Sequence, residues 1–583
     1  MKKYLALFLA VVMALSLCAC AGGPDNSGNV DNEAAAALLS DAFIDPINDW
    51  AQYDELIDKI KLETDTAKRT EMMHEAEDIL MSNGCVIPLY YYNDIYMMKE
   101  NVSGMYANLF GYKFFHKVTM ADGNKTLRVN LASEPDFLDP ALNSSVDGAC
   151  LAVNSFAGLY TYNAEGKTVP DLATGYTVSD PAEDGSVTFT VTLKEGLKWS
   201  DGTALTAADF EKSWKRAAAT ETASDYGYMF SSFVGYPNEL AVKADNDTTL
   251  TFTLAAPCAY IEGLMAFPTF FPVPAAAFAT EAGAPGAWCT EAGFVSNGPF
   301  ICTGWNHDVS MTYEKNPNYH DAANVTVDKI EFMLSADDTA IYAAYNAGNV
   351  DIIDTVPNDE IAKLLADNNK EFKIVDNLGT YYVAFNANSE LFAGKTPEQA
   401  ACMRLAFNIL IDRNAICETV GQTGQVAASS YIPLGMADGN GGIFKPKAED
   451  NSYYDVNAIN DDFEGTVAKA REYLEAAGFK FGADGKLSAE TPIVIEYLTN
   501  DGSGHVAAAQ IMQQDFAEIG IQMTIQQVEW NTFLEERKQG HFDIAREGWL
   551  ADFDDPINML EMFQTASGNN DCQFGRYEGW DAE

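Results

Sequence analysis

Residues 187–219 read VTFTVTLKEGLKWSDGTALTAADFEKSWKRAAA, and this stretch carries the clearest local order in the chain. Val187 to Leu193 alternates apolar residues with threonine, which is the period-two pattern of a half-buried strand. Lys194-Glu195-Gly196 predicts a turn after that strand. Thr206 then predicts the N-cap of a helix that runs from Ala207 to Ala219. The stretch is therefore expected to form a strand, a loop and a helix.

Short strands and helices continue to alternate on both sides of this stretch. Strands are expected at Cys85 to Tyr92, Leu127 to Leu131, Thr249 to Leu254, Val350 to Ile353 and Ile521 to Val528, and helices at Tyr53 to Leu80, Thr339 to Gly348 and Gly504 to Ile519. Pro88, inside the first of these strands, indicates an edge or a bend. The alternation predicts α/β lobes with mixed sheets rather than an all-β sandwich.

The composition indicates a large folded protein with an acidic surface. At about 150 residues per domain, 583 residues correspond to about three to four domains, or to fewer large ones. Hydrophobic residues make up 47% of the chain, which excludes a wholly disordered protein. Lys and Arg number 36 against 85 Asp and Glu, a net charge of −49. This charge repels phosphate backbones, and because the sequence has no basic patch we expect no nucleic-acid partner.

The N-terminus predicts export and a lipid anchor. Met1-Lys2-Lys3 is a short basic region, and Tyr4 to Leu17 is apolar but too short to span a bilayer. It ends in Leu17-Cys18-Ala19-Cys20, which resembles a bacterial lipobox with Cys20 as the acylated residue; a secretory peptide cut nearby is the alternative. Residues 1–20 would be a lipoprotein signal peptide and residues 21–52 a tether. The protein would then be extracytoplasmic, at the cell surface or in the periplasm, and anchored to the bacterial membrane by its lipid.

Neither metal nor cofactor chemistry is indicated by the sequence. The cysteines beyond the leader are scattered without a CxxC pair, and most are expected to be buried free thiols. The histidines show no HExxH or similar metal spacing. No GxSxG elbow, Walker loop or GxGxxG is present, so we expect no enzyme, no metal site and no cofactor.

A series of motifs, in the right order, resembles a known family. Trp199-Ser200-Asp201-Gly202 with Thr206-Ala207-Ala208-Asp209-Phe210 looks like the signature segment of solute-binding proteins for peptide-type ABC importers. The motifs that follow are Ser296 to Phe300, Lys315 to Tyr319, Ala344 to Gly348, Val383 to Asn386, Arg404 to Asp412 and Gly548 to Asp552. From Leu127 to Glu583 the chain is similar to an oligopeptide-binding protein of solute-binding protein family 5. The resemblance implies a two-lobed, type II periplasmic-binding-protein-like α/β fold with an extra domain inserted in the first lobe.

The order of segments departs from that family. The family continues after its Ala-Asp-Tyr/Phe motif to a Pro-Leu-Tyr-Tyr strand, whereas this chain stops soon after Tyr577 to Asp581. Tyr53 to Phe115 resembles the missing C-terminal segment, and Asp41 to Asn48 repeats the motif Ala551 to Asn558. The sequence therefore resembles a circular permutant in which Met120 to Lys125 joins the old ends. A truncated gene read behind the tail of a tandem copy is the alternative.

On this reading the chain divides as follows. Residues 53–93 would complete lobe 2 and residues 94–124 would complete lobe 1. Lobe 1 itself would comprise residues 125–145 and 291–395, the inserted domain residues 146–290, and lobe 2 residues 396–583.

The resemblance also implies a ligand site. Asp552 matches the family aspartate that pairs with the peptide α-amine, and Arg546 corresponds to a family arginine near the ligand carboxylate. The other candidate ligand-binding residues are Gly548, Trp549 and Leu550, then Ser133, Glu134 and Pro135, and finally Tyr226, Tyr382, Asn386 and His505. Each also has an ordinary structural explanation: a loop aspartate, a salt-bridged arginine, a strand-ending turn, a histidine at a helix start, or packed aromatic side chains.

The expected function is that of a monomeric substrate-binding lipoprotein. It would capture an oligopeptide between two closing lobes and deliver it to the permease subunits of an ABC transporter. Two alternatives remain open. The same fold could bind another solute, such as a sugar or a nickel chelate, or the protein could be a secreted hydrolase or an adhesin.

Overall fold

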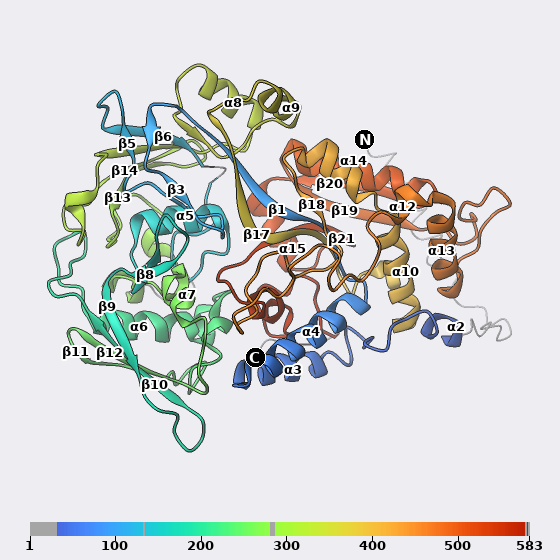
Figure 1. The fold of residues 1–583 in the computed structure, drawn as a ribbon, viewed down its shortest axis with the longest axis horizontal. Helices are drawn as coiled ribbons and strands as arrows, with labels where there is room; N and C mark the ends of the chain where they lie inside the picture. Colours follow the sequence, from blue (N-terminus) through green and yellow to red (C-terminus); the bar gives the residue numbers. More distant parts are fainter. Residues whose placement is uncertain (1–31, 132–133, 280–285, 578–579, 581–583) are drawn as a thin grey trace, which may run out of the picture.

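The computed structural model describes residues 32–131, 134–279, 286–577 and 580. They form two lobes that lie side by side and are joined by two long strands, β1 (Val86–Met98) and β17 (Phe372–Phe385) (Figure 1). The predicted two-lobed α/β fold is confirmed.

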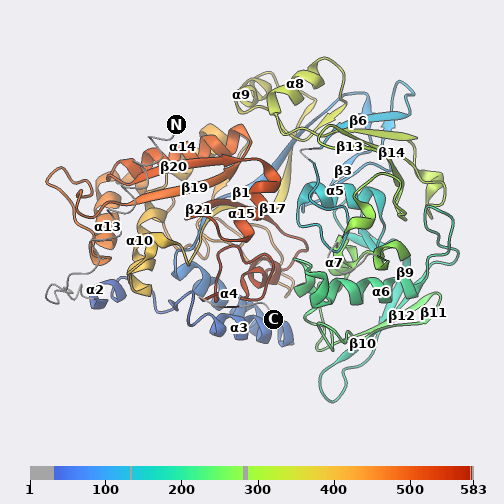
Figure 2. The same cartoon turned by 180° about the vertical axis from the view of Figure 1, so that it is seen from behind.

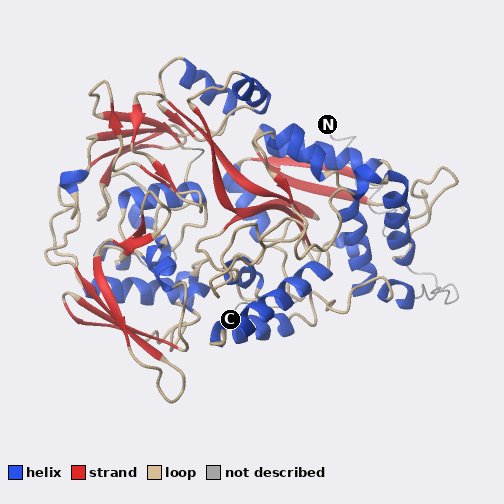
Figure 3. Ribbon diagram, viewed as in Figure 1, coloured by secondary structure: helices blue, strands red, loops and turns tan. Residues whose placement is uncertain are grey.

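One large mixed sheet runs through both lobes. Its strand order is β13-β14-β15-β6-β16-β1-β17-β21-β19-β20, and β18 pairs with β1. Besides β1 and β17 its strands are β6 (Thr126–Asn130), β13 (Phe300–Asn306), β14 (Ser310–Lys315), β15 (Lys329–Met333), β16 (Ile352–Ile353), β18 (Val426–Ala427), β19 (Val494–Asn500), β20 (Gln522–Val528) and β21 (Ile544–Leu550). β6 is parallel to its neighbours β15 and β16, and β19 is parallel to β20 and β21. Figure 3 shows two long strands of this sheet, β1 and β17, crossing from one lobe to the other.

The two connecting strands pair with each other along most of their length. β1 and β17 are antiparallel. Their register shifts twice, once just before Tyr90 of β1 and once just after Tyr91. Pro88 lies at the first of these shifts, and β1 as a whole is an interior strand between β16 and β17. A strand pair that crosses between lobes and is interrupted by bulges can bend there without losing the rest of its ladder.

The second lobe packs helices on both faces of β19 and β21. On one face α10 (Pro397–Leu410), α13 (Phe463–Ala476) and α14 (Ser503–Ala517) form a core with Ile495 and Tyr497. On the other face α15 (Trp530–Lys538) packs against Leu498 and Ala545. The other α-helices that the structure describes in this lobe are α2 (Asn32–Ala36), α3 (Ala51–Leu62), α4 (Thr66–Ser82), α11 (Arg413–Ile416), α12 (Ala458–Asp461) and α16 (Ile557–Leu560). The side of the sheet that carries α15 is the side that faces the first lobe (Figure 2).

The first lobe carries its own small sheet in the order β11-β12-β10-β9, from β9 (Ala173–Val178), β10 (Val187–Leu193), β11 (Val242–Asn246) and β12 (Thr249–Leu254). α6 (Ala207–Ala218) packs beside it, and the Asp209 carboxylate accepts a hydrogen bond from the N–H of its N-cap residue, Thr206, at 2.8 Å. The strand and helix predicted from residues 187–219 are thus confirmed. The other elements of this lobe are α5 (Val146–Ser155), α7 (Ile261–Ala266), α8 (Asp338–Asn346), α9 (Asn358–Ala366), β7 (Tyr160–Tyr162) and β8 (Thr168–Pro170), with the short strands β2 (Val102–Ser103), β3 (Tyr106–Ala107), β4 (Lys113–Phe114) and β5 (Thr119–Met120).

The helical region predicted from Tyr53 to Leu80 consists of two helices, α3 (Ala51–Leu62) and α4 (Thr66–Ser82). The chain is extended at Glu63, and the Asp65 carboxylate then caps α4 by accepting hydrogen bonds from the N–H groups of Ala67 and Lys68, both at 3.1 Å. A carboxylate at an N-cap starts a new helix because it satisfies donors that have no partner within the helix.

The beginning of α3 lies directly against the end of the chain. The Trp50 ring stacks on Phe574 with ring centroids 4.1 Å apart, and its Nε1 donates to the carbonyl oxygen of Phe563 at 2.8 Å. The N–H of Gly575 donates to the carbonyl oxygen of Pro46 at 2.9 Å.

The cysteines that the structure describes are all free, and six of them are buried: Cys85, Cys150, Cys289, Cys302, Cys402 and Cys572. The expectation of mostly buried free thiols is confirmed. Among the described residues, no helix combines the length and the apolar character needed to cross a bilayer.

Candidate ligand-binding cleft

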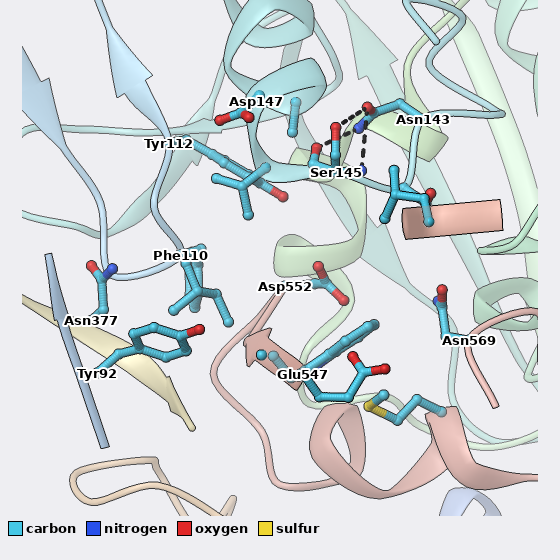
Figure 4. A pocket seen from close by; sticks show the side chains of 18 of the residues that line it. Tyr92, Phe110, Tyr112, Asn143, Ser145, Asp147, Asn377, Glu547, Asp552 and Asn569 are labelled. Carbon is cyan, nitrogen blue, oxygen red and sulfur yellow. Dashed lines mark hydrogen bonds between the residues drawn. The ribbon is translucent and has the colours of Figure 1, made fainter. Parts of the chain in front are cut away.

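A cavity of about 320 Å³ lies between the two lobes. The first lobe contributes the start of α5 and the loop before it, and the second contributes β21, α15 and the segment that follows β21. Figure 4 shows the Asp552 carboxylate near the middle of this site, with Ser145 and Asp147 on one side and Glu547 and Asn569 on the other. A pocket of this size, with polar groups that converge on it, suits a small ligand.

Asp552 is the buried carboxylate of this cavity. Its side chain is 5% exposed. Its Oδ2 accepts a hydrogen bond from Asn558 Nδ2 at 2.9 Å, and its Oδ1 accepts a longer one from the Tyr226 hydroxyl at 3.4 Å. Burial raises the pKa of Asp552 to about 8, because these neutral donors only partly replace lost water. The carboxylate has no cationic partner among the described residues.

The strand before Asp552 forms one wall of the cavity. β21 pairs with β17 so that Gly548 lies opposite Tyr381, Trp549 opposite Thr380, and Leu550 opposite Gly379. These three predicted residues line the cavity, as does Arg546, the fourth predicted residue of β21. At Gly548 a β-carbon would lie 2.1 Å from the Tyr92 hydroxyl, so only glycine leaves room for that side chain.

Arg546 and His505 lie together at the far end of this wall. Arg546 Nε donates to Asn500 Oδ1 at 2.9 Å, and an Arg546 terminal nitrogen lies 3.4 Å from His505 Nε2. His505 Nδ1 is 3.0 Å from the Tyr381 hydroxyl, and the two rings are stacked. Burial, and then the positive charge of Arg546, hold the pKa of His505 well below its usual value. The histidine is therefore neutral at pH 7, and Arg546 is the cation at this end.

A second buried acid, Glu547, follows Arg546 on β21. It is 2% exposed, its Oε2 accepts a hydrogen bond from Arg537 at 2.7 Å, and Arg537 also pairs with Asp571 at 2.8 Å. Burial raises the pKa of Glu547 to about 8, and its Oε1 has no hydrogen-bond partner. This part of the wall is therefore already charge-paired, unlike Asp552.

The remaining predicted site residues lie away from the cavity. Tyr382 packs against Tyr431, Asn386 Nδ2 donates to the carbonyl oxygen of Gly540 at 2.7 Å, and Glu134 accepts a hydrogen bond from the N–H of Asp308 at 2.9 Å. Pro135, the residue after Glu134, is buried. Ser133 and Cys20 lie outside the described residues. None of the described members of this set lines the cavity.

Several lining residues were not predicted from the sequence. They are Tyr92, Phe110, Tyr112, Asn143, Ser145, Asp147, Asn377, Trp530, Arg537, Glu547, Asn569 and Asp571. Tyr92 and Tyr112 come from the segment before β6, far in sequence from β21. Only the three-dimensional fold brings these two tyrosines next to β21. The run of three tyrosines from Tyr90 to Tyr92 is the one feature of the sequence that could have drawn attention to Tyr92.

The repeated motif takes similar turns at its two positions. Asp45 Oδ1 accepts from the N–H of Ile47 at 2.9 Å, and Asp555 Oδ1 accepts from the N–H of Ile557 at 3.0 Å. Only the copy that contains Asp552 borders the cavity. The other copy lies beside Asn388 and Arg404.

Two lobes joined by a pair of strands, with a cavity lined by polar and apolar side chains between them, are the architecture of a solute-binding protein. The family model described as "Bacterial extracellular solute-binding proteins, family 5 Middle" matches residues 167–571, and the chain belongs to this family. The oligopeptide-binding protein OppA of Bacillus subtilis is 32% identical over 468 residues, which cover 77% of this chain and 79% of that protein. The predicted family is therefore confirmed.

Solved structures agree with this assignment. The murein tripeptide binding protein MppA of Escherichia coli superposes with a TM-score of 0.68 at 26% identity, covering 77% of this chain and 84% of that chain. OppA of Listeria monocytogenes bound to peptide gives a TM-score of 0.66 at 26% identity, covering 78% and 86%.

Proposed function

We propose that this protein captures oligopeptides between its two lobes and delivers them to an ABC importer. The observation that carries the proposal is Asp552: a carboxylate buried in the inter-lobe cavity with only neutral partners. A free peptide α-amine is a cation that needs such a partner once water is excluded. The relatives named for oligopeptide and dipeptide binding support the same ligand class.

The geometry of the cavity suits an extended peptide. Asp552 lies at one end, Arg546 lies on the same wall towards the other, and the main chain of Gly548 to Leu550 lies between them. An α-amine, a run of peptide groups and a carboxylate would meet these three features in turn. Backbone recognition of this kind gives affinity with little dependence on side chains.

The lobes would close over the ligand as rigid units about β1 and β17. Lys538 of α15 already reaches across the cleft, where its Nζ donates to Ser144 Oγ at 3.1 Å and pairs with Asp225. Tyr226, from the first lobe, likewise contacts Asp552 of the second. Contacts made only when the lobes meet stabilise the closed state, which is the form that would hold peptide.

We further propose that the protein acts as an extracytoplasmic, lipid-anchored monomer with no catalytic role. The leader sequence and the lipobox-like Cys20 support the anchor, and the extracellular family supports export. The permease subunits of the importer would be its protein partners.

The segment order is proposed to be that of a circular permutant, in which residues 53–93 complete lobe 2 and residues 94–124 complete lobe 1. The position of β1 between β16 and β17 supports this, as do the contacts of Trp50 and Gly575 across the two ends of the chain. A chain re-ordered to start at Lys125, with Tyr577 linked to Asp41 and an end at Asp122, is expected to fold and bind the same peptides. Failure of that chain to melt cooperatively, while the natural order does, would contradict the permutant.

The proposed function is tested by thermal melting of the chain from Pro24 onward with short peptides, free or N-acetylated. Ligand at one hundred times its dissociation constant adds about 2.7 kcal/mol to the free energy of unfolding, enough for a visible rise in Tm. Free-amine peptides should raise Tm, and acetylated ones should not.

Two variants sharpen this test. Asp552→Asn should abolish the rise in Tm, whereas Asp554→Asn, which alters an exposed carboxylate two residues away, should leave it intact. If no peptide moves Tm, the ligand class is wrong. Peptide cleavage after long incubation would instead indicate a hydrolase.

A further inference from the structure

A second chamber, of about 280 Å³, opens beside the cavity that contains Asp552. The two share three lining residues, Asp147, Trp530 and Arg546, so they lie next to each other. The chamber lies between the first lobe, which supplies Asn130 and Asp354, and the second, which supplies His505 and Arg546. A ligand bound in the main cavity could therefore extend a side chain into it.

The walls of this chamber are rich in acids. Its lining acids are Asp147, Asp354, Asp501 and Glu529. Arg546 is its only cation, because the pKa of His505 is held well below its usual value by burial and by Arg546. Outside the chamber Lys113 offsets part of this charge, since it pairs with Asp354 at 2.5 Å, but it also pairs with Asp94 at 2.8 Å. The chamber therefore keeps an excess of negative charge.

Two acceptors at this site have no donor among the described residues. The Asp147 carboxylate takes part in no hydrogen bond or ion pair, although it lies in the first turn of α5 and borders both cavities. Asn130 is fully buried, with Nδ2 donating to the carbonyl oxygens of Met333 and Ser335 at 3.1 Å and 3.3 Å. These two bonds fix the amide orientation and leave Asn130 Oδ1 unpaired. Asn130 Oδ1 is a buried acceptor without a donor, which is uncommon and indicates a missing partner, whereas the unpaired Asp147 carboxylate is half-buried and open to the cavities.

We propose that this chamber binds a cationic side chain of the peptide, lysine or arginine, with Asp147 as its principal partner. An ammonium or guanidinium group supplies the donors that Asp147 and Asn130 lack, and it offsets the excess of carboxylates. An acidic side chain would meet repulsion from the same groups. The inference rests on the proposed function and adds a preference for basic peptides to it.

The position of the chamber predicts which ligand residue enters it. Arg546 and Leu550 are four residues apart on β21, about 13 Å at the rise of an extended strand. A ligand whose α-amine meets Asp552 would cover that length with about four extended residues. The basic side chain should therefore be at the third or fourth residue, not at the first.

The test is titration calorimetry of the purified protein with alanine tetrapeptides that have a free α-amine. One residue at a time is replaced by lysine, by norleucine, which keeps the length without the charge, or by glutamate. We expect lysine at the third or fourth position to bind about tenfold or more tightly than norleucine, and glutamate to bind more weakly than either. Asp147→Asn should remove the advantage of lysine over norleucine, measured as the ratio of the two affinities within that variant. Asp328→Asn, an exposed carboxylate of the same lobe, should retain it.

Each outcome separates this inference from the proposed function. If tetra-alanine and its variants all fail to bind, peptide binding itself is refuted. If they bind but lysine and norleucine have equal affinity at every position, only the basic-side-chain preference is overturned. An advantage of lysine that survives Asp147→Asn would also overturn the assignment, because the preference would then arise elsewhere.

Discussion

The buried carboxylate of Asp552 predicts an unusual pH dependence of peptide affinity. Burial raises its pKa to about 8, so in the free protein it holds a proton below that pH. A peptide α-amine ordinarily has a pKa of about 7.7–8.0 and is protonated below it. The bound pair needs an ionised carboxylate and a protonated amine. Affinity should therefore fall as pH drops below 8, and fall again as pH rises well above 8.

The expected change in peptide affinity follows from the pKa values of Asp552 and of the peptide α-amine. At pH 8 about half of the carboxylates are ionised and about half of the amines are protonated, so about a quarter of encounters have both groups in the binding form. At pH 6 nearly every amine is protonated, but only about 1% of the carboxylates are ionised. Affinity should thus be about 20-fold weaker at pH 6 than at pH 8, with a maximum near pH 8.

Isothermal titration of one free-amine peptide at pH 6, 7, 8 and 9 measures this profile directly. Binding at pH 7 should also release close to one proton, which appears as a dependence of the heat on the ionisation enthalpy of the buffer. In Asp552→Asn the loss of affinity between pH 8 and pH 6 should disappear. Its affinity at pH 8 should be lower than that of the wild type by about 30-fold to several thousand-fold, because one partner of a buried charge pair is removed. Asp554→Asn should keep the wild-type profile. A dissociation constant that is flat from pH 6 to pH 8 in the wild type would refute the role given to Asp552.

Three further perturbations test the surroundings of the site. Arg69→Met breaks the two-bond pair with Asp555, both bonds 2.8 Å, and should lower the free energy of unfolding in urea by about 3–5 kcal/mol. Gly548→Ala places a methyl group against the Tyr92 hydroxyl and should weaken peptide binding, and adding Tyr92→Phe should recover part of the loss in calorimetry. Lys538→Met removes the ion pair across the cleft and should increase the radius of gyration in small-angle scattering of the ligand-free protein, while leaving Tm nearly unchanged.

Local patterns predicted the local structure well. The strand Val187–Leu193 and the helix that begins at Ala207 both occur as the alternation and Thr206 indicated. These elements depend on residues close together in sequence, so period and capping decide them. The break between α3 and α4 was missed because Asp65 could equally have been an exposed helical residue.

The site itself was only partly accessible from the sequence. Asp552 and Arg546 were predicted because they stand in a recognisable motif, and both line the cavity. Tyr382 was placed in the groove by the same reasoning, yet its ring is buried against Tyr431. On a strand, neighbouring side chains point to opposite faces, so a motif places a residue near the ligand without deciding which way it points.

The role proposed for Asp147 could not have been predicted from the sequence. Nothing in its surroundings distinguishes it from the many acids of this chain, and its significance comes from facing Arg546 and Trp530 across the cleft. Residues from different lobes that line one cavity come together only when the two lobes meet. They carry no local signal, since each partner sits in a segment that would fold in the same way without the other.

The circular permutation proposed above would have little consequence for the site, because the site depends on contacts rather than on connectivity. Arg69 of α4 and Asp555 are held together by two short hydrogen bonds across 486 residues of chain, and Asp555 follows Asp552 by three positions. Moving the chain ends changes the lengths of the loops that must close during folding. The entropic cost of closing a loop grows only slowly with its length. Moving the ends leaves the pairing of β1 with β17 and the packing of Trp50 on Phe574 unaltered. The acid that would receive the peptide α-amine is thus supported by a helix from the opposite end of the sequence.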